Sequence, residues 1–292
     1  MIEINETIAR KVLDVVDAGL VHGLGEPKPG QMCVEAAVNF AMGLPHGDEP
    51  ACVAPALRRL KIRLNDSRWS SNQARAKGLR RLALAQLGSA GVLDEKTFAK
   101  RVVRLAIQTS VPQALRAAAG ICRDEPKKAA MLKAAEACEK DPTRENAAQA
   151  RASAYAADAA YAAAAAYAYA ANAAYAAYAA AYAAAADAAA AADAAAAAAA
   201  ADAAAYAAAY AAYAAYAAAY AAAADAAAAA DAAAAADAAA AADAAAAADA
   251  AYAAAYAAAR DQSLLAFAEG VVQILIEMKA PGCQWLFLTE AA

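Results

Sequence analysis

A cysteine, a histidine and an aspartate lie close together in residues 31–50, and these residue types carry out nucleophilic catalysis in many enzymes. In QMCVEAAVNF followed by GLPHGDEP, Cys33 falls in the first turn of a predicted helix, and His46 and Asp48 follow in a loop. A helix N-terminus lowers the pKa of a thiol, a histidine accepts its proton, and an aspartate orients the histidine. Gln31 adds an amide donor for an oxyanion. This pattern predicts a cysteine-dependent enzyme centred on Cys33.

A structural interpretation fits these residues better. One short helix and one loop would have to carry the whole catalytic set, and no local cysteine-protease signature, such as a Cys followed by Trp, is present. The zinc-ligand types His22, Cys33, His46 and Cys52 also lack the close spacing of structural zinc sites. We therefore expect a buried core cysteine, no metal and no cofactor, and we keep the cysteine-dependent enzyme as an alternative.

Basic residues between positions 58 and 104 are the second candidate for a functional surface. The segment 1–151 carries 24 Lys and Arg against 17 Asp and Glu, an excess that attracts phosphate groups. A solvated helix face, or a docking surface for the chain's own acidic tract, explains the same pattern, because aromatic residues are not interleaved with the basic ones. The residues that we assign to a nucleic-acid surface are Arg58, Arg59, Lys61, Arg63, Arg80 and Arg81.

The middle of the chain has a different composition. Residues 152–259 hold all 14 tyrosines and nine aspartates but no Lys, Arg, Gly or Pro, and nearly everything else is alanine. Alanine is the strongest helix former, so the tract is predicted to be α-helical. The aspartate spacing of six also suggests a β-solenoid, but Val, Ile and Leu for its inward positions are missing.

The tract contains an internal duplication. Tyr175, Tyr178 and Tyr182 recur as Tyr213, Tyr216 and Tyr220, each shifted by 38 residues. Such a shift turns a straight helix by about 200°, so a bend near residues 183–202 into an antiparallel hairpin would let the tyrosine faces meet. A straight rod of about 160 Å is the alternative. The tyrosines that we assign to a self-association face are Tyr175, Tyr178, Tyr182, Tyr206, Tyr210, Tyr213, Tyr216, Tyr220, Tyr252 and Tyr256.

Amphipathic patterns on either side of the tract predict the elements that must position these residues. We expect an all-α protein with a basic helical head in residues 1–148, the helical tract in 149–260, and an amphipathic helix with an extended tail in 261–292. Asp94 is predicted to cap one of the head helices. The last helix carries too much apolar surface to remain exposed, so it packs either on the head or on copies of itself.

Composition also limits where the protein acts. The opening MIEINETIARKVLDVV has acidic residues where a signal peptide has basic ones, and five widely spaced cysteines suggest reduced thiols. The longest uninterrupted alanine run, residues 194–201, is too short to cross a bilayer. We expect a cytoplasmic protein with no membrane partner.

The combination of QMCVEAAVNFAMGLPHGDEPACVAPALRRLKIRLND, the Ala/Tyr/Asp tract and VVQILIEMKAPGCQWLFL resembles a family of uncharacterised proteins from bacteria and their phages or other mobile elements. The resemblance covers the whole chain. It implies a mobile-element origin but no activity and no site residues.

These observations favour a structural or interaction protein, a helical scaffold or spacer that self-associates through Tyr and Ala faces. Its partner is expected to be itself or an unidentified protein. A nucleic-acid-associated regulator acting through the basic head and a cysteine-dependent enzyme are the two alternatives.

Overall fold

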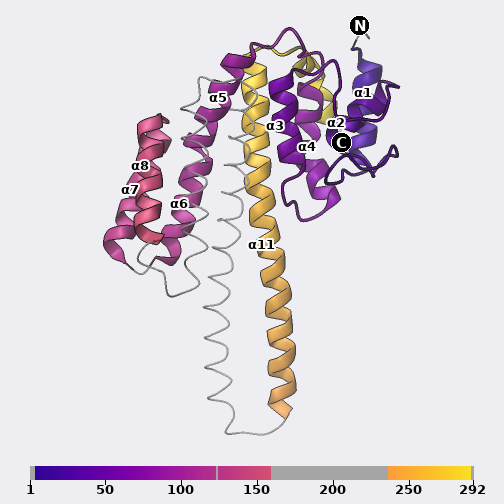
Figure 1. Ribbon diagram of the computed structural model, residues 1–292. Helices are drawn as coiled ribbons and strands as arrows, with labels where there is room; N and C mark the ends of the chain where they lie inside the picture. The colour runs from indigo at the N-terminus through magenta and orange to yellow at the C-terminus, as the bar shows by residue number, and fades with distance from the viewer. Residues whose placement is uncertain (1–3, 123, 159–235, 291–292) are drawn as a thin grey trace.

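The protein is all-α, as predicted. The computed structural model describes residues 4–122, 124–158 and 236–290 (Figure 1); for residue 121, residues 155–158 and residues 236–256 it describes the backbone only. Within these ranges the chain forms nine α-helices and one 3-10 helix, and it contains no strand. None of the described helices is both long and apolar enough to cross a membrane.

Four helices form the N-terminal half of the head. They are α1 (Glu6–Asp17), α2 (Val34–Ala41), α3 (Pro55–Asn65) and α4 (Asn72–Ala85). Side-chain caps fix where they start: Asn5 accepts a hydrogen bond from the backbone N–H of Ile8, and Ser71 accepts one from Ala74. All four lie in the part of the chain that the sequence predicts to be a helical head. Helix α2 packs against α1, α3 and α4, so it lies at the centre of this half, and α4 also packs against α1.

The next four helices extend the head. They are α5 (Glu95–Gln108), α6 (Ser110–Ile121), α7 (Glu125–Lys140) and α8 (Arg144–Asp158). Asp94 caps α5, which confirms that prediction. The polar segment that contains α7 was not predicted to be helical, yet Asp124 caps it and Pro126 occupies its first turn. Helix α8 crosses the expected boundary at residue 148, and Ala150 and Ala154 beyond that boundary are fully buried.

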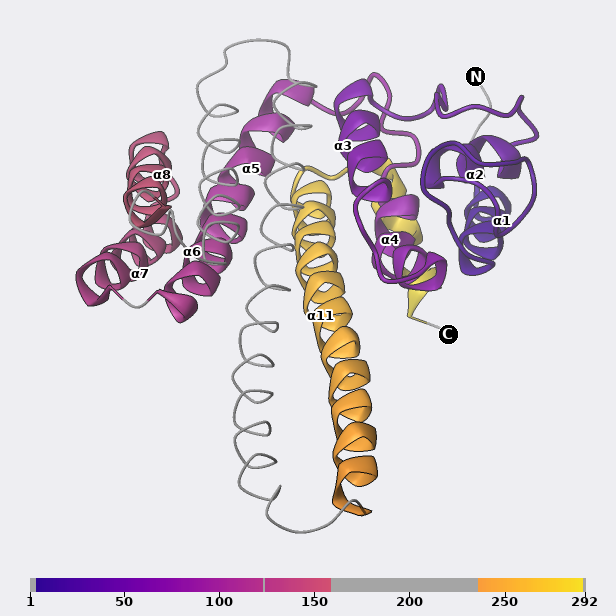
Figure 2. The ribbon, with the colours of Figure 1, turned by 60° about the horizontal axis from the view of Figure 1, so that its bottom comes forward.

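The C-terminal part of the chain returns to the head. Helix α11 (Ala236–Glu277) is 42 residues long, and its last turns lie against α4 and α5 (Figures 1 and 2). This confirms the first of the two arrangements expected for the last helix. The other end of α11 extends past the coloured helices of the head in both views, and no other described helix lies beside it.

The chain ends in a 3-10 helix rather than in the predicted extended tail. This element, η1 (Pro281–Thr289), packs on α4, and Leu286 and Leu288 are buried there. Gly282 explains the close approach, because a Cβ atom at that position would collide with backbone atoms of Leu84 and Leu87. The tail is therefore part of the head core.

Several predictions lie outside the described residues. They are the bend near residues 183–202, the 38-residue duplication, the alternative β-solenoid across most of the tract, and the tyrosines from Tyr175 to Tyr220. Tyr252 and Tyr256 lie on α11, but their side chains are outside what the structure describes. At both ends of the tract the described backbone is helical, in α8 and α11.

Candidate functional site

Cys33 lies at a helix N-terminus and is buried in the core, as the structural interpretation expects, and its pKa shifts in the direction opposite to the one that the enzyme hypothesis requires. It is the N-cap of α2, and the backbone N–H of Ala36 donates to its sulfur at 3.4 Å. Only 4% of the residue is exposed. Burial raises the pKa of the Cys33 thiol, and the hydrogen bonds from the helix N-terminus offset this only in part. The expectation of a lowered pKa is therefore wrong, and the thiol is protonated at neutral pH.

The proposed catalytic partners of Cys33 do not form hydrogen bonds with it. His46 is exposed, and its Nε2 atom lies 3.0 Å from the carbonyl oxygen of Gly25, where the bond holds one loop against another. Gln31 is exposed, and Asp48 is half-buried. The Asp48 charge raises the pKa of Cys33 further, which is the opposite of activation. The thiol therefore has no hydrogen bond to a base or to an amide donor of this set.

A buried polar cluster that we did not predict lies in the same region. Glu35 on α2, Lys61 on α3 and Gln86 at the end of α4 are all fully buried. The Lys61 Nζ atom lies 3.6 Å from the Glu35 Oε1 atom, which is an ion pair but longer than an ordinary hydrogen bond. Neither the Glu35 carboxylate, the Lys61 ammonium nor the Gln86 amide has a hydrogen-bond partner among the described residues.

Burial brings the pKa of Glu35 and the pKa of Lys61 closer together. It raises the pKa of Glu35 to about 7, although the charge of Lys61 opposes the rise. It also lowers the pKa of Lys61, an effect that Glu35 opposes. Low polarity disfavours both charged forms, and each ion stabilises the other. Glu35 and Lys61 therefore form a coupled pair in which the proton of Glu35 is gained or lost near neutral pH.

The pair is closed to solvent, which limits its role to structure. A substrate cannot reach side chains with no exposed surface, and the residues that line the groove between α1 and α2 include none of the cluster. Removing one member of a buried ion pair typically costs about 3–5 kcal/mol, because the other charge stays buried without a partner. The cluster therefore ties α2 to α3.

Lys61 carried a sequence signal that the basic pattern concealed. Leu57, Leu60 and Leu64 occupy one face of α3, and Lys61 falls on the same face. All four are fully buried. A lysine inside an apolar stripe indicates a buried cation that needs an acid, and Glu35, on a helix that is otherwise almost wholly apolar, is that acid.

The predicted nucleic-acid surface is largely used by the protein itself. Lys61 is not on the surface at all. Arg58 pairs with Glu49, and Arg80 bonds Asp17 at 2.7 Å. Arg81 pairs with Glu269 of α11. Of the six predicted residues, Arg59 and Arg63 are the two that are exposed and form no ion pair with a described residue. Four of the six predicted residues therefore form ion pairs with acidic residues of the protein itself.

Polar contacts along α11 show where the helix joins the head. Asp261 accepts a hydrogen bond from the backbone N–H of Ser70 at 2.9 Å, and Glu277 pairs with Arg101 at 3.0 Å. Between them, Glu269 pairs with Arg81, and Ser263 accepts a hydrogen bond from Gln113. The partners come from the loop before α4 and from α4, α5 and α6, so four parts of the head fix this end of α11.

An apolar seam runs between these polar contacts. The α11 side chains of Leu264, Phe267, Val271, Val272 and Leu275 are all at most 2% exposed. Gly270 lets α11 approach α5 closely, because a Cβ atom there would overlap the side chain of Leu105. We call residues 260–277 of α11 the anchored segment, and residues 236–259 the projecting segment. The candidate functional site is the junction between the anchored segment and the head.

Comparison with known proteins identifies no relative. No protein-family model matches the chain, and no curated protein or solved structure matches it significantly. The resemblance to proteins of bacteria and their phages or mobile elements thus stays a prediction, and the junction must be interpreted from its own geometry.

Proposed function

We propose that the protein is a helical scaffold that self-associates through the Tyr and Ala faces of its tract. The carrying observation is the anchored segment, which fixes one end of a continuous 42-residue helix in the core of a folded head. The projecting segment continues the same helix for about 36 Å at 1.5 Å per residue. A helix held at one end by a rigid head presents its other end at a defined distance and direction, which is the task of a spacer or scaffold.

Composition supports the use of the tract as a contact surface. Tyr252 and Tyr256 are four residues apart on the projecting segment, and residues at this spacing share one face of a helix. Tyrosine contributes a large apolar area together with a hydroxyl, and alanine lets two helix backbones come close. The partner that offers the same surface is a second copy of the chain.

The cysteines support a reducing compartment. None of the five forms a disulfide, and three of them, Cys33, Cys122 and Cys138, are buried. Disulfides persist mainly in oxidising compartments, so we place the scaffold in the cytoplasm. The two alternative functions have less support: the thiol of Cys33 is inaccessible, and four of the six basic residues assigned to nucleic acid are bound to acids.

Sedimentation of the full chain over a range of concentrations tests the proposal. The variant to compare replaces the ten predicted contact tyrosines with alanine, which preserves helix propensity while removing the aromatic surface. A matched variant replaces the same tyrosines with phenylalanine and keeps that surface. We expect the wild type and the phenylalanine variant to associate, and the alanine variant to show a dissociation constant at least about tenfold higher.

The melting temperature of the head is the control in this experiment, because the ten tyrosines lie outside the residues described as its core. Equal association of the alanine variant, or a wild type that is monomeric throughout the micromolar range, contradicts a scaffold that assembles through the tract.

A further inference from the structure

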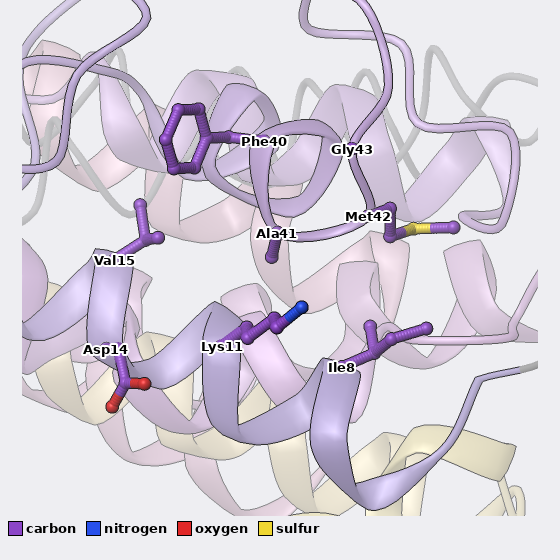
Figure 3. A pocket seen from close by; sticks show the side chains of 8 residues that line it. All are labelled: Ile8, Lys11, Asp14, Val15, Phe40, Ala41, Met42 and Gly43. Atoms are coloured by element: carbon purple, nitrogen blue, oxygen red, sulfur yellow. The ribbon is translucent and has the colours of Figure 1, made fainter.

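A groove on the head lies between α1 and the end of α2. Its volume is about 560 Å³, and α1 forms one wall while the last turn of α2 and the following residues form the other (Figure 3). The lining is mostly apolar, with two charged side chains on the α1 wall. The lining residues are Ile8, Lys11, Asp14, Val15, Phe40, Ala41, Met42 and Gly43.

Phe40 is the first sign that something covers this groove. It is 41% exposed, whereas every other residue of α2 is buried. Complete burial of a phenylalanine side chain contributes about 1.5–3 kcal/mol, so the head alone leaves part of this free energy unused. The ring stands beside the groove across from Val15 (Figure 3). An apolar group from outside can therefore pack against the ring without any change in α2.

Lys11 and Asp14 are the second sign. They are exposed and one helical turn apart on α1, and neither forms an ion pair or a side-chain hydrogen bond with a described residue. Their neighbours differ in this respect, since Arg10 pairs with Glu6 and Asp17 pairs with Arg80. In Figure 3 the end of Lys11 extends along the groove, whereas the carboxylate of Asp14 points away from the α2 wall. The α1 wall thus presents one cation in the groove and one anion at its edge, each exposed.

We propose that this groove is an interface with a second copy of the head, related by a two-fold axis that passes beside α1. Opposite charges one turn apart make the surface complementary to itself: when two α1 helices lie antiparallel, Lys11 of each copy faces Asp14 of the other. A two-fold interface of this kind uses the same patch on both subunits. Phe40 of each copy then covers the apolar lining of the other, and two ion pairs fix the register.

The inference goes beyond the proposed function, because no residue of the tract takes part in this contact. A protein with both surfaces has two independent ways to associate, one through its heads and one through its tracts. Such a chain links copies at both ends, so its assemblies can grow past a dimer.

Charge exchange in the full chain tests the interface by sedimentation. Lys11→Glu places two acidic residues opposite each other in each half of the interface, and we expect the dissociation constant to rise at least about tenfold. The double variant Lys11→Glu/Asp14→Lys restores the complementarity and should return the constant to within about threefold of the wild type. Arg59→Glu makes the same charge change on an exposed residue of α3 and should leave association unchanged.

The measurement is repeated in the variant that lacks the ten tract tyrosines, so that the two surfaces are separated. Association that persists there and responds to Lys11→Glu supports the head interface even if the tract proposal fails. Association in the wild type that Lys11→Glu does not weaken, or that the double variant does not restore, overturns the inference. The inference is also overturned if the head stays monomeric and an amphipathic peptide or an apolar small molecule binds in the groove instead. The melting temperature of each variant shows that the head is folded.

Discussion

The two segments of α11 are the same helix held in two different ways. The anchored segment carries Leu, Val, Ile and Phe on its buried face and is joined to the head by ion pairs and hydrogen bonds. The projecting segment contains only Ala, Asp and Tyr. Its helical state needs no apolar stripe, because alanine has the highest intrinsic helix propensity. Tertiary packing therefore stabilises the anchored segment, and the intrinsic propensity of alanine favours the helix in the projecting segment.

The two segments therefore have different roles: the anchored segment sets the direction of the helix, and the projecting segment sets its length. Side-chain packing fixes how a helix is oriented, and it requires specific residues at specific positions. Propensity fixes only that the helix continues, and it tolerates repetition. A low-complexity sequence can therefore serve as a projecting element only where a complex sequence anchors it, and the anchored segment provides that anchor here.

The largest expected effect comes from removing packing in the anchored segment. Phe267 is 2% exposed, and Phe267→Ala should lower the free energy of unfolding of the head by about 3–5 kcal/mol, because it leaves a cavity between α11 and the head. Denaturant unfolding followed by tryptophan fluorescence measures this, since both tryptophans lie in the head. Gln262→Ala, at an exposed position on the same helix, is the control and should cost less than about 0.5 kcal/mol. A loss below about 1 kcal/mol for Phe267→Ala would mean that α11 is not part of the head core.

The second effect is a pH dependence of the free energy of unfolding, and it arises from residues of the head. The pKa of Glu35 rises from 4.5 to about 7 on folding, so between these values the folded head binds more protons than the unfolded chain. Stability from this group is therefore highest at low pH and falls as pH rises, by roughly 3 kcal/mol at about 1.4 kcal/mol per pH unit. Lys61, whose pKa is lowered, contributes with the opposite sign towards alkaline pH, so the comparison is made between pH 4.5 and 6.5.

The variant Glu35→Met/Lys61→Met removes both titrating groups and provides the comparison. Its free energy of unfolding, measured across the same pH range, should lack the decline that the Glu35 carboxyl produces in the wild type. Near pH 7 it should be as stable as the wild type or more so, since buried ion pairs often stabilise less than apolar residues of similar volume. Identical pH profiles of the two proteins would show that Glu35 titrates as an ordinary carboxyl.

The coupling energies of the ion pairs in the anchored segment should decrease as the exposure of their side chains increases. Arg81 and Glu269 are 37% and 33% exposed, whereas Arg101 and Glu277 are 42% and 53% exposed. Double-mutant cycles with alanine should give a coupling energy of about 1 kcal/mol for the first pair and about 0.3 kcal/mol for the second, because water screens the second pair more strongly. Equal coupling energies would show that the strength of these ion pairs does not depend on how exposed their side chains are.

The smallest effect on the head should come from the projecting segment. Ala247→Gly costs about 1 kcal/mol of local helix stability and should reduce helicity by circular dichroism without changing the melting temperature of the head. The matched variant Ala268→Gly, at a position 1% exposed, also loses a buried methyl group and should lower that melting temperature by several degrees. Equal shifts from the two variants would remove the distinction between the segments.

Sequence patterns predicted most of the fold because the head helices are amphipathic and well capped. The apolar periods of α1, α3 and α5 and the Asp94 cap were each sufficient to place a helix. Helix α7 was missed because Met131 is the one large residue among its buried residues, and the others, Ala134, Ala135 and Cys138, are small and give little periodic signal within a polar segment. The 3-10 helix η1 was missed because its position depends on contact with α4, which no local pattern encodes.

Prediction of the candidate site was less complete, because charged residues were expected to be exposed on the surface. Arg80, Arg81 and Lys61 look alike in a sequence, but they pair with Asp17, Glu269 and Glu35, which are distant in the chain. Only the fold brings those acids close. Cys33 was placed correctly at a helix N-terminus, yet the effect of burial on its pKa exceeds that of the helix, and burial is a property of the whole head.

Hydrogen exchange of the full chain, measured by mass spectrometry at a concentration where it is monomeric, tests the central claim most directly. We predict that backbone amides of residues 264–275 exchange only as fast as the slowest amides of the head, because they open only with its core. Amides of residues 240–256 should exchange at least about tenfold faster, since local helix fraying exposes them. Equal protection of the two segments, or fast exchange in residues 264–275, would contradict a helix that is anchored at one end and projects at the other.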